Sequence, residues 1–198
     1  MMEEKELTTK EQKIISCATD TINALEDTIK QYVKELIALS NWVVESFKQS
    51  GKLLLFGNGG SAADAQHIAA EFVNRFQIER NPLPAISLVT DTSILTSISN
   101  DYDFSQVFSK QILAISSPHD IALGISTSGN SKNVIEAIKV AKNIGLKTAV
   151  FTGKDGGVLK DLADLSIIVA SNKTPRIQEV HIFMGHMLCQ LVEEELFD

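Results

Sequence analysis

The sequence has little of what marks secreted, nucleic-acid-binding or membrane-spanning proteins. Its two cysteines, Cys17 and Cys189, each lie among apolar residues with helical spacing, so neither a disulfide framework nor a zinc finger is expected. Acidic residues outnumber basic ones, 25 to 18, and the net charge of −7 argues against broad attraction to nucleic acid or an anionic membrane. No apolar run approaches the ~20 residues that span a bilayer. An anionic substrate would therefore need a local binding site.

The bulk composition favours one compact globular domain. Hydrophobic residues make up 44% of the 198 residues and there are only four prolines, which suits a domain of the common size of roughly 100–200 residues. The amino terminus, MMEEKELTTKEQK, is charged and lacks the apolar core of a secretory signal. We therefore expect a cytoplasmic protein.

Residues 9–50 contain neither glycine nor proline and carry a helical pattern. Apolar residues recur at three- and four-residue spacings from Ile15 to Phe47, and Gly51 is a plausible helix stop. We expect two helical segments with a break near residues 38–42. Their apolar stripe needs a partner, either the sheet layer of the same subunit or another chain.

The remainder, residues 51–198, alternates between apolar runs of strand length and helical patterns. The expected strands are Leu53–Phe56, Ala85–Val89, Ile121–Ile125, Thr148–Thr152 and Leu165–Ala170, and the expected helices lie at about 61–77, 92–99, 104–116, 131–144, 157–163 and 176–196. Continuous apolar strands that alternate with helices indicate a parallel sheet covered on both faces. The predicted fold class is α/β, a flavodoxin-like three-layer αβα sandwich with a five-stranded parallel sheet and an N-terminal helical segment, one structural unit overall.

Two segments, LLLFGNGGSAA and ALGISTSGNSKNV, share the order strand, small-residue turn, helix. Ligands of open parallel sheets bind where such turns meet helix amino termini. The second turn, residues 124–131, carries four hydroxyls around one glycine and is typical of a phosphate cradle; they belong to Ser126, Thr127, Ser128 and Ser131. The alternative is a turn whose Ser or Asn merely caps the helix.

The first turn also matches a weak dinucleotide pattern. Gly57–Ala62 satisfies G-x-G-x-x-A after a strand, but Asp91 lies further downstream than the usual ~20 residues. The hydroxyl-rich second turn has no role in that scheme, and there is no G-x-x-x-x-G-K-[ST] sequence. A dinucleotide oxidoreductase is therefore the weakest interpretation.

The helix after the first turn places His67 and Glu71 one turn apart on one face. An imidazole and a carboxylate at this spacing could bind a metal or share acid–base work. They could equally form an exposed helix pair, and Arg75 could form a weak surface ion pair with Glu71. In the final helix Gln178 and His186 are polar residues in an otherwise apolar region. His181 lies on a different face of this helix from those two residues. A lone histidine there is more often a core residue than a ligand.

Taken together, these segments resemble the sugar isomerase (SIS) domain family, and within it the bacterial phosphoheptose isomerases. The resemblance covers nearly the whole chain and rests on GNGGSAADAQHIAAE, TDTSILTSISNDYDF, GISTSGNS, FTGKDGG and RIQEVHI…GH. It implies an aldose–ketose isomerase that converts sedoheptulose 7-phosphate to D-glycero-D-manno-heptose 7-phosphate through an enediol, on the route to lipopolysaccharide-core or other surface-glycan heptose.

The resemblance also implies one zinc ion per subunit and a homotetramer with active sites between subunits. The implied zinc ligands are His67, Glu71, Gln178 and His186, and the implied acid–base pair is Glu71 and His186. The implied substrate contacts are Asn58, Gly59, Gly60, Glu71, Asn100, Asp101, Ser126, Thr127, Ser128, Ser131 and Gln178, with Ser61 and Arg75 as further candidates. Some family members have an acidic residue where Pro175 stands, which puts any role of that position in doubt.

One geometric conflict follows from the implied ligands. Gln178 and His186 are eight residues apart, ~12 Å along a straight helix, so both cannot bind one zinc from such a helix. Either Gln178 belongs to an irregular lead before the helix, or the two ligands come from different subunits. A second function also stays open, a non-catalytic SIS protein that binds a sugar phosphate or the replication initiator. Relatives of that kind replace the 71 carboxylate and the 186 histidine, whereas this chain keeps both.

Overall fold

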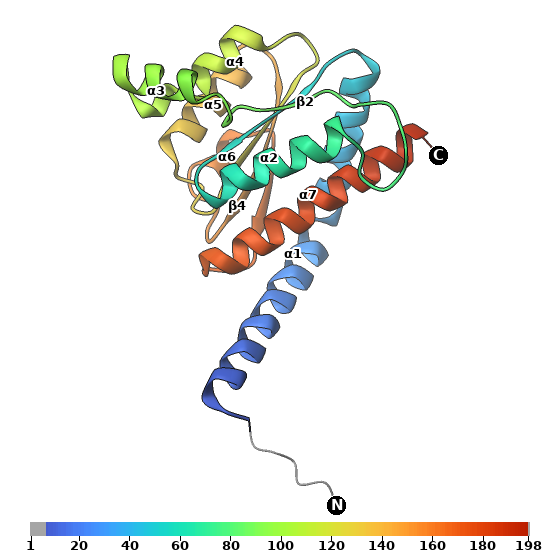
Figure 1. The fold of residues 1–198 in the computed structure, drawn as a ribbon, viewed down its shortest axis with the longest axis vertical. Coiled ribbons are helices and arrows are strands. Elements are labelled where there is room, and N and C mark those ends of the chain that lie inside the picture. Colours follow the sequence, from blue (N-terminus) through green and yellow to red (C-terminus); the bar gives the residue numbers. More distant parts are fainter. Residues whose placement is uncertain (1–6, 198) are drawn as a thin grey trace, which may run out of the picture.

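The computed structural model describes residues 7–197 and contains a five-stranded, all-parallel sheet (Figure 1). Its strand order is β2-β1-β3-β4-β5. The strands are β1 (Leu53–Gly57), β2 (Ala85–Ser87), β3 (Ile121–Ser126), β4 (Lys147–Gly153) and β5 (Leu165–Val169). Residues 1–6, at the start of the charged amino terminus analysed above, and residue 198 lie outside the described residues.

Helices cover both faces of the sheet. One face carries α1 (Thr9–Lys48), α2 (Gly60–Val73) and α7 (Thr174–Phe197); the other carries α3 (Thr92–Asp101), a 3₁₀ turn (Phe104–Gln106), α4 (Ser109–Ile115), α5 (Lys132–Asn143) and α6 (Leu159–Leu162). Strand alternation feeds the two cores, since Leu53 and Leu55 of β1 pack in the first and Leu54 and Phe56 in the second. The predicted αβα sandwich is confirmed.

The N-terminal segment forms α1, in which two helical stretches meet at a kink. A capping box between Thr8 and Glu11 starts it. The two expected helical segments are present, but the expected position of the break, near residues 38–42, is wrong. Leu39 and Ser40 are buried in regular helix, and the kink lies at Tyr32 (φ −121°, ψ 16°). The division of the chain at residue 50 stays a prediction.

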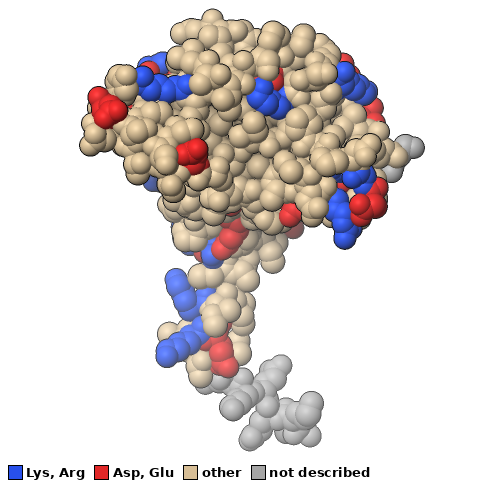
Figure 2. All heavy atoms as spheres, turned by 45° about the horizontal axis from the view of Figure 1, so that its top comes forward, with Lys and Arg blue, Asp and Glu red and all other residues tan. Residues whose placement is uncertain are grey.

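The first half of α1 projects away from the sheet (Figure 1). Side chains of both charge signs lie along this projection (Figure 2). Three large apolar side chains there are also exposed, Ile14 by 70%, Ile15 by 52% and Ile22 by 55%. Among residues 7–197, no helix combines the length and the apolar character that crossing a membrane requires.

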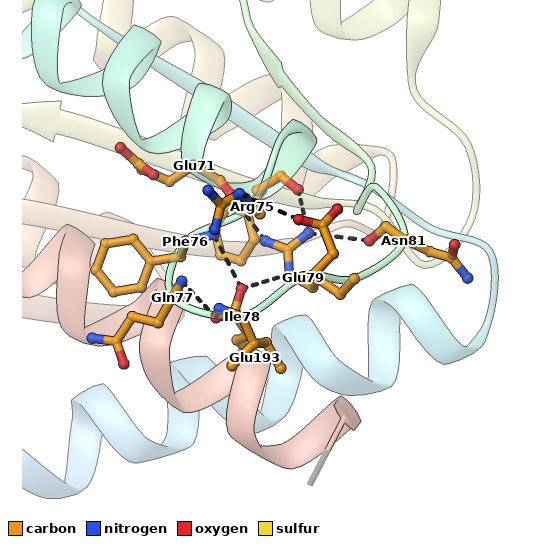
Figure 3. A network of polar contacts seen from close by, with 10 residues as sticks. Glu71, Arg75, Phe76, Gln77, Ile78, Glu79, Asn81 and Glu193 are labelled. Carbon is orange, nitrogen blue, oxygen red and sulfur yellow. Dashed lines mark hydrogen bonds and ion pairs between the residues drawn. The ribbon is translucent and has the colours of Figure 1, made fainter.

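Two expected helices are shorter than their sequence pattern. The helix expected to reach residue 77 stops at Val73, because the N–H groups of Phe76, Gln77 and Ile78 bond to the Glu193 carboxylate rather than continuing the helical ladder (Figure 3). The helix expected over 104–116 is divided into the 3₁₀ turn and α4. At the end of α2, tertiary contacts thus override the local periodicity.

His181 of α7 is a buried core residue, as the sequence pattern favours. Its side chain is fully buried and its Nε2–H donates to the Thr152 carbonyl oxygen at 3.0 Å. Burial lowers the pKa of His181 to about 4, although the bond to Thr152 opposes the shift. The imidazole is therefore neutral in the folded protein near pH 7.

This burial makes stability depend on pH. Between pH 6.5 and about 4 the unfolded chain binds a proton at His181 that the folded chain does not, so the free energy of unfolding falls as the pH falls. Between pH 7 and 5 we expect wild type to lose about 2 kcal/mol relative to His181→Phe. Urea denaturation of both proteins measures this difference, and a pH-independent difference would contradict a neutral His181.

Candidate functional site

The two candidate turns lie where the strand order of the sheet changes direction, between β1 and β3. β1 and β3 are adjacent, with β2 beyond one and β4 beyond the other, so the turns that follow them lie at the crevice where ligands of open sheets bind. The first turn leads into α2 at Gly60 and the second into α5 at Lys132. The two turns therefore lie at the same edge of the sheet, after neighbouring strands.

The second turn does not behave as a simple helix cap. Ser131 stands at the N-cap of α5, yet its side chain makes no capping bond; its Oγ lies 2.9 Å from the Oγ of Ser126. Ser128 Oγ accepts the Asn130 N–H at 3.2 Å within the turn. Thr127 and Ser128 are half-buried. A helix start with hydroxyls not committed to capping suits an anion.

The two turns are tied together by an amide pair. Asn58 and Asn133 exchange reciprocal side-chain hydrogen bonds, each of 2.8 Å. Ser61 is buried in the first turn of α2, where its N–H donates to the Asn58 carbonyl at 3.0 Å. Asn133 is buried too, and nothing in the sequence pattern marks it, since it reads as an ordinary helical position of α5.

The residues that directly follow FTGKDGG support the second turn. The Leu159 N–H donates to the Gly129 carbonyl at 3.1 Å, and the Val158 N–H donates to Asn130 Oδ1 at 3.1 Å. These bonds fix the turn from the β4 side.

Helices α2 and α7 run side by side in the same direction (Figure 1). A Cβ on Gly60 would lie 2.1 Å from Gln178 Nε2, and a Cβ on Gly185 would lie 2.5 Å from Ile68 Cδ1, so both glycines allow close approach. Gly60 therefore faces the start of α7, while Ile68 lies against its middle. This pairing brings His67 opposite His186.

His67, Glu71 and His186 form one cluster between the two helices. The Nε2 atoms of His67 and His186 are 2.9 Å apart, and His67 Nε2 is 3.4 Å from Glu71 Oε1. The Phe76 ring stacks on the His186 ring with centroids 5.6 Å apart and planes 27° apart. Burial and the nearby His67 lower the pKa of His186, and Glu71 opposes this shift.

The donor atoms of this cluster suit a zinc ion. Two imidazole nitrogens bound tetrahedrally at ~2.0–2.1 Å lie about 3.3 Å apart, so the 2.9 Å pair would need to separate by only a few tenths of an ångström. No group of three or more His, Cys, Asp or Glu side chains within residues 7–197 already has the geometry of a formed metal site. The cluster thus supplies donor atoms that suit zinc, but by itself it does not form a complete zinc site.

Gln178 lies outside the cluster. α7 begins at Thr174, so Gln178 and His186 share one helix, and of the two alternatives the irregular lead that would contain Gln178 is excluded. Its amide instead lies beside Gly60. Eight residues separate it from His186, ~12 Å of helix. One chain therefore holds three of the four implied ligands together.

Three other candidates also stay apart from the cluster. Arg75 lies beyond α2 and its Nε is 3.5 Å from Glu79 Oε2, so the surface ion pair it makes is with Glu79 rather than with Glu71. Asn100 and Asp101 are exposed at the end of α3, where the Asn100 amide donates to Asp101 at 2.8 Å. No hydrogen bond or ion pair between described residues joins these three to the turns or the cluster.

Comparison with known proteins shows the family of this chain. Residues 18–153 match the family model described as SIS domain, which is well over half of the chain. The chain is 54% identical over 178 residues to the phosphoheptose isomerase of Roseiflexus sp. strain RS-1, covering 90% of each protein. The chain belongs to the phosphoheptose isomerases of the SIS domain family.

Solved structures of this family share the fold. The phosphoheptose isomerase GmhA from Neisseria gonorrhoeae has a TM-score of 0.89 and 39% identity, covering 94% of this chain and all of that one. A phosphoheptose isomerase from Francisella tularensis has a TM-score of 0.90 and 35% identity with the same coverage. The SIS fold is therefore preserved along nearly the whole length.

The close approach of Gly60 and Gln178 can be tested by a double-mutant cycle. In Gly60→Ala the new methyl displaces the Gln178 amide, a flexible group, so we expect the fold to persist and sugar-phosphate binding to weaken about tenfold. In a Gln178→Ala background the same substitution meets no amide and should change binding little. Calorimetric titration of the four proteins measures the coupling, and additive effects would contradict the contact.

Proposed function

We propose that this chain is an aldose–ketose isomerase that converts sedoheptulose 7-phosphate to D-glycero-D-manno-heptose 7-phosphate. The observation that carries the proposal is the contact of His67 with both Glu71 and His186, in a chain that also has the hydroxyl-lined turn and is 50–55% identical to phosphoheptose isomerases over most of its length. The product would enter ADP-heptose synthesis for a lipopolysaccharide core or related surface glycan.

The residue types match the chemistry of this isomerisation. Moving the carbonyl between C2 and C1 removes a proton from one carbon and returns one to the other through an enediol. Glu71 and His186 are the acid–base candidates, and positioned groups of this kind contribute typically ~10²–10⁴ in rate. The turn that carries Ser126, Ser128 and Ser131 would hold the phosphate, a non-reacting handle that orients the sugar.

A zinc ion is part of the proposal. His67, Glu71 and His186 would hold it, with Gln178 completing the set from another subunit. When bound, it would polarise the sugar carbonyl and stabilise negative charge on the enediol oxygens.

We further propose a cytoplasmic homotetramer with active sites between subunits. Gln178, Asn100 and Asp101 are separated from the cluster within one chain, which is what a site assembled from several copies would require. The exposed isoleucines on the projecting part of α1 supply apolar surface that a second copy can bury. Neither nucleic acid nor membrane is a proposed partner.

Two other functions are less well supported. A sugar-phosphate sensor or replication-initiator partner needs the phosphate turn but has no need of Glu71 and His186 in contact with His67. A dinucleotide oxidoreductase leaves both the hydroxyl-lined turn and the cluster unused.

The direct test is to incubate the purified protein with sedoheptulose 7-phosphate and to follow the aldose product by NMR. We expect conversion. A folded oligomer supplied with zinc that shows no turnover would overturn the isomerase function.

Glu71→Gln separates catalysis from binding. The amide keeps the size of the carboxyl but cannot accept a proton as a base, so we expect kcat to fall by at least about 10²-fold while the sugar phosphate still binds. Glu45→Gln makes the same carboxyl-to-amide change at an exposed position near the end of α1, outside the candidate site, and it should leave kcat far less affected. Steady-state kinetics together with calorimetric binding provide the comparison, and an unchanged kcat in Glu71→Gln would refute the role given to Glu71.

A further inference from the structure

A buried ion pair lies under the segment that follows α2. Arg80, in the loop, and Glu193, near the end of α7, are 1% and 3% exposed in their side chains, and Arg80 Nε lies 2.6 Å from Glu193 Oε2. The residues are 113 positions apart in the sequence and neither belongs to the site described above. Removing two charges from water costs free energy that their attraction does not always repay, so a buried ion pair is weak evidence of a purely stabilising role.

Glu193 organises the backbone of this loop. Its carboxylate accepts the N–H groups of Phe76 at 3.1 Å, Gln77 at 2.7 Å and Ile78 at 2.9 Å, and Figure 3 shows these residues gathered around it. Burial alone would raise the pKa of Glu193, but the backbone N–H groups and Arg80 outweigh it and hold the pKa below its usual value. The carboxylate is thus charged and fully bonded near pH 7.

Arg80 attaches the same loop to the end of α2. Its Nη2 donates to the Glu71 carbonyl at 2.9 Å and its Nη1 to the Phe72 carbonyl at 2.9 Å. These carbonyls lie in the last turn of α2, where the helix offers them no internal partner. Arg80 therefore caps the turn that carries the Glu71 side chain.

The other end of the loop reaches His186. Phe76, whose N–H is held by Glu193, stacks its ring on the His186 imidazole. The ion pair is thereby linked to Glu71 through a carbonyl oxygen and to His186 through an aromatic ring. It touches neither reacting side chain.

We propose that Arg80 and Glu193 are positioning residues for the isomerase reaction, which hold the loop so that Phe76 fixes the His186 ring and α2 presents Glu71. The kinetic side of this proposal rests on the proposed function, whereas the placement of the His186 ring does not. The two can therefore fail separately.

The test compares Glu193→Gln and Phe76→Leu with wild type and with Val192→Ala. Glu193→Gln removes the charge of the anchor, and Phe76→Leu removes the ring while leaving the ion pair intact. Val192 is a fully buried core residue next to Glu193, and its apolar side chain forms none of the hydrogen bonds of the ion pair, so Val192→Ala lowers stability and leaves those bonds in place. Val192→Ala therefore shows how a loss of stability alone affects the two readouts below.

The first readout is the ¹H–¹³C NMR signal of the His186 ring in the metal-free protein at fixed pH, assigned with His186→Gln. The stacked Phe76 ring shifts these protons upfield. We expect the shift to disappear in Phe76→Leu, to shrink in Glu193→Gln and to persist in Val192→Ala.

The second readout is steady-state kinetics with sedoheptulose 7-phosphate. We expect kcat to fall about tenfold or more in Glu193→Gln and Phe76→Leu with KM little changed, because misplacing reacting groups costs rate rather than phosphate binding. Val192→Ala should keep its kcat below its melting temperature.

Two results would overturn the proposal. One is a His186 signal in Phe76→Leu and Glu193→Gln that matches wild type. The other is a kcat loss in Val192→Ala equal to theirs, which would make the pair merely structural. If wild type shows no turnover, the isomerase function fails, and the NMR signal alone decides the placement of the ring. Should Glu193→Gln fail to fold, Arg80→Lys takes its place, since it keeps the positive charge but loses the guanidinium bonds to the Glu71 and Phe72 carbonyls, and it should show the same losses.

Discussion

The site depends on the close parallel packing of α2 against α7. Two glycines, Gly60 and Gly185, lie where a Cβ would meet Gln178 and Ile68 of the opposite helix. With the helices this close, His67 meets His186 across the interface and the two Nε2 atoms come within 2.9 Å. A larger residue at position 185 would push the helices apart, and the imidazoles would separate with them.

The same packing divides the implied zinc ligands into two groups. Because α2 and α7 run in the same direction, Gly60 at the start of α2 lies beside Gln178 at the start of α7. Further along both helices, Ile68 of α2 lies beside Gly185 of α7. His67, Glu71 and His186 therefore come together, whereas Gln178 stays beside the glycine turn. The isomerase proposal thus calls for a second copy, and the exposed apolar residues of the projecting α1 offer a surface through which copies can associate.

Local patterns in the sequence predict much of this arrangement. The apolar runs mark all five strands, the turn residues mark both loops, and the i, i+4 spacing places His67 and Glu71 on one face. The meeting with His186 could not be predicted from periodicity, because it depends on which helices pack together. The same holds for Arg80 and Glu193, whose contact ends α2 at Val73 rather than at 77. The expected position of the break in α1 is wrong for a related reason, since burial of Leu39 against the body of the protein keeps that stretch helical.

The claim that one active site draws Gln178 and Glu71 from different subunits is tested most directly by subunit complementation. Gln178→Ala and Glu71→Gln proteins, each inactive alone, are unfolded together, refolded as mixed oligomers and assayed with sedoheptulose 7-phosphate. If the two residues come from different chains, about a quarter of the sites regain both native residues and activity returns to that extent. Mixed oligomers that remain as inactive as either parent would contradict a shared site.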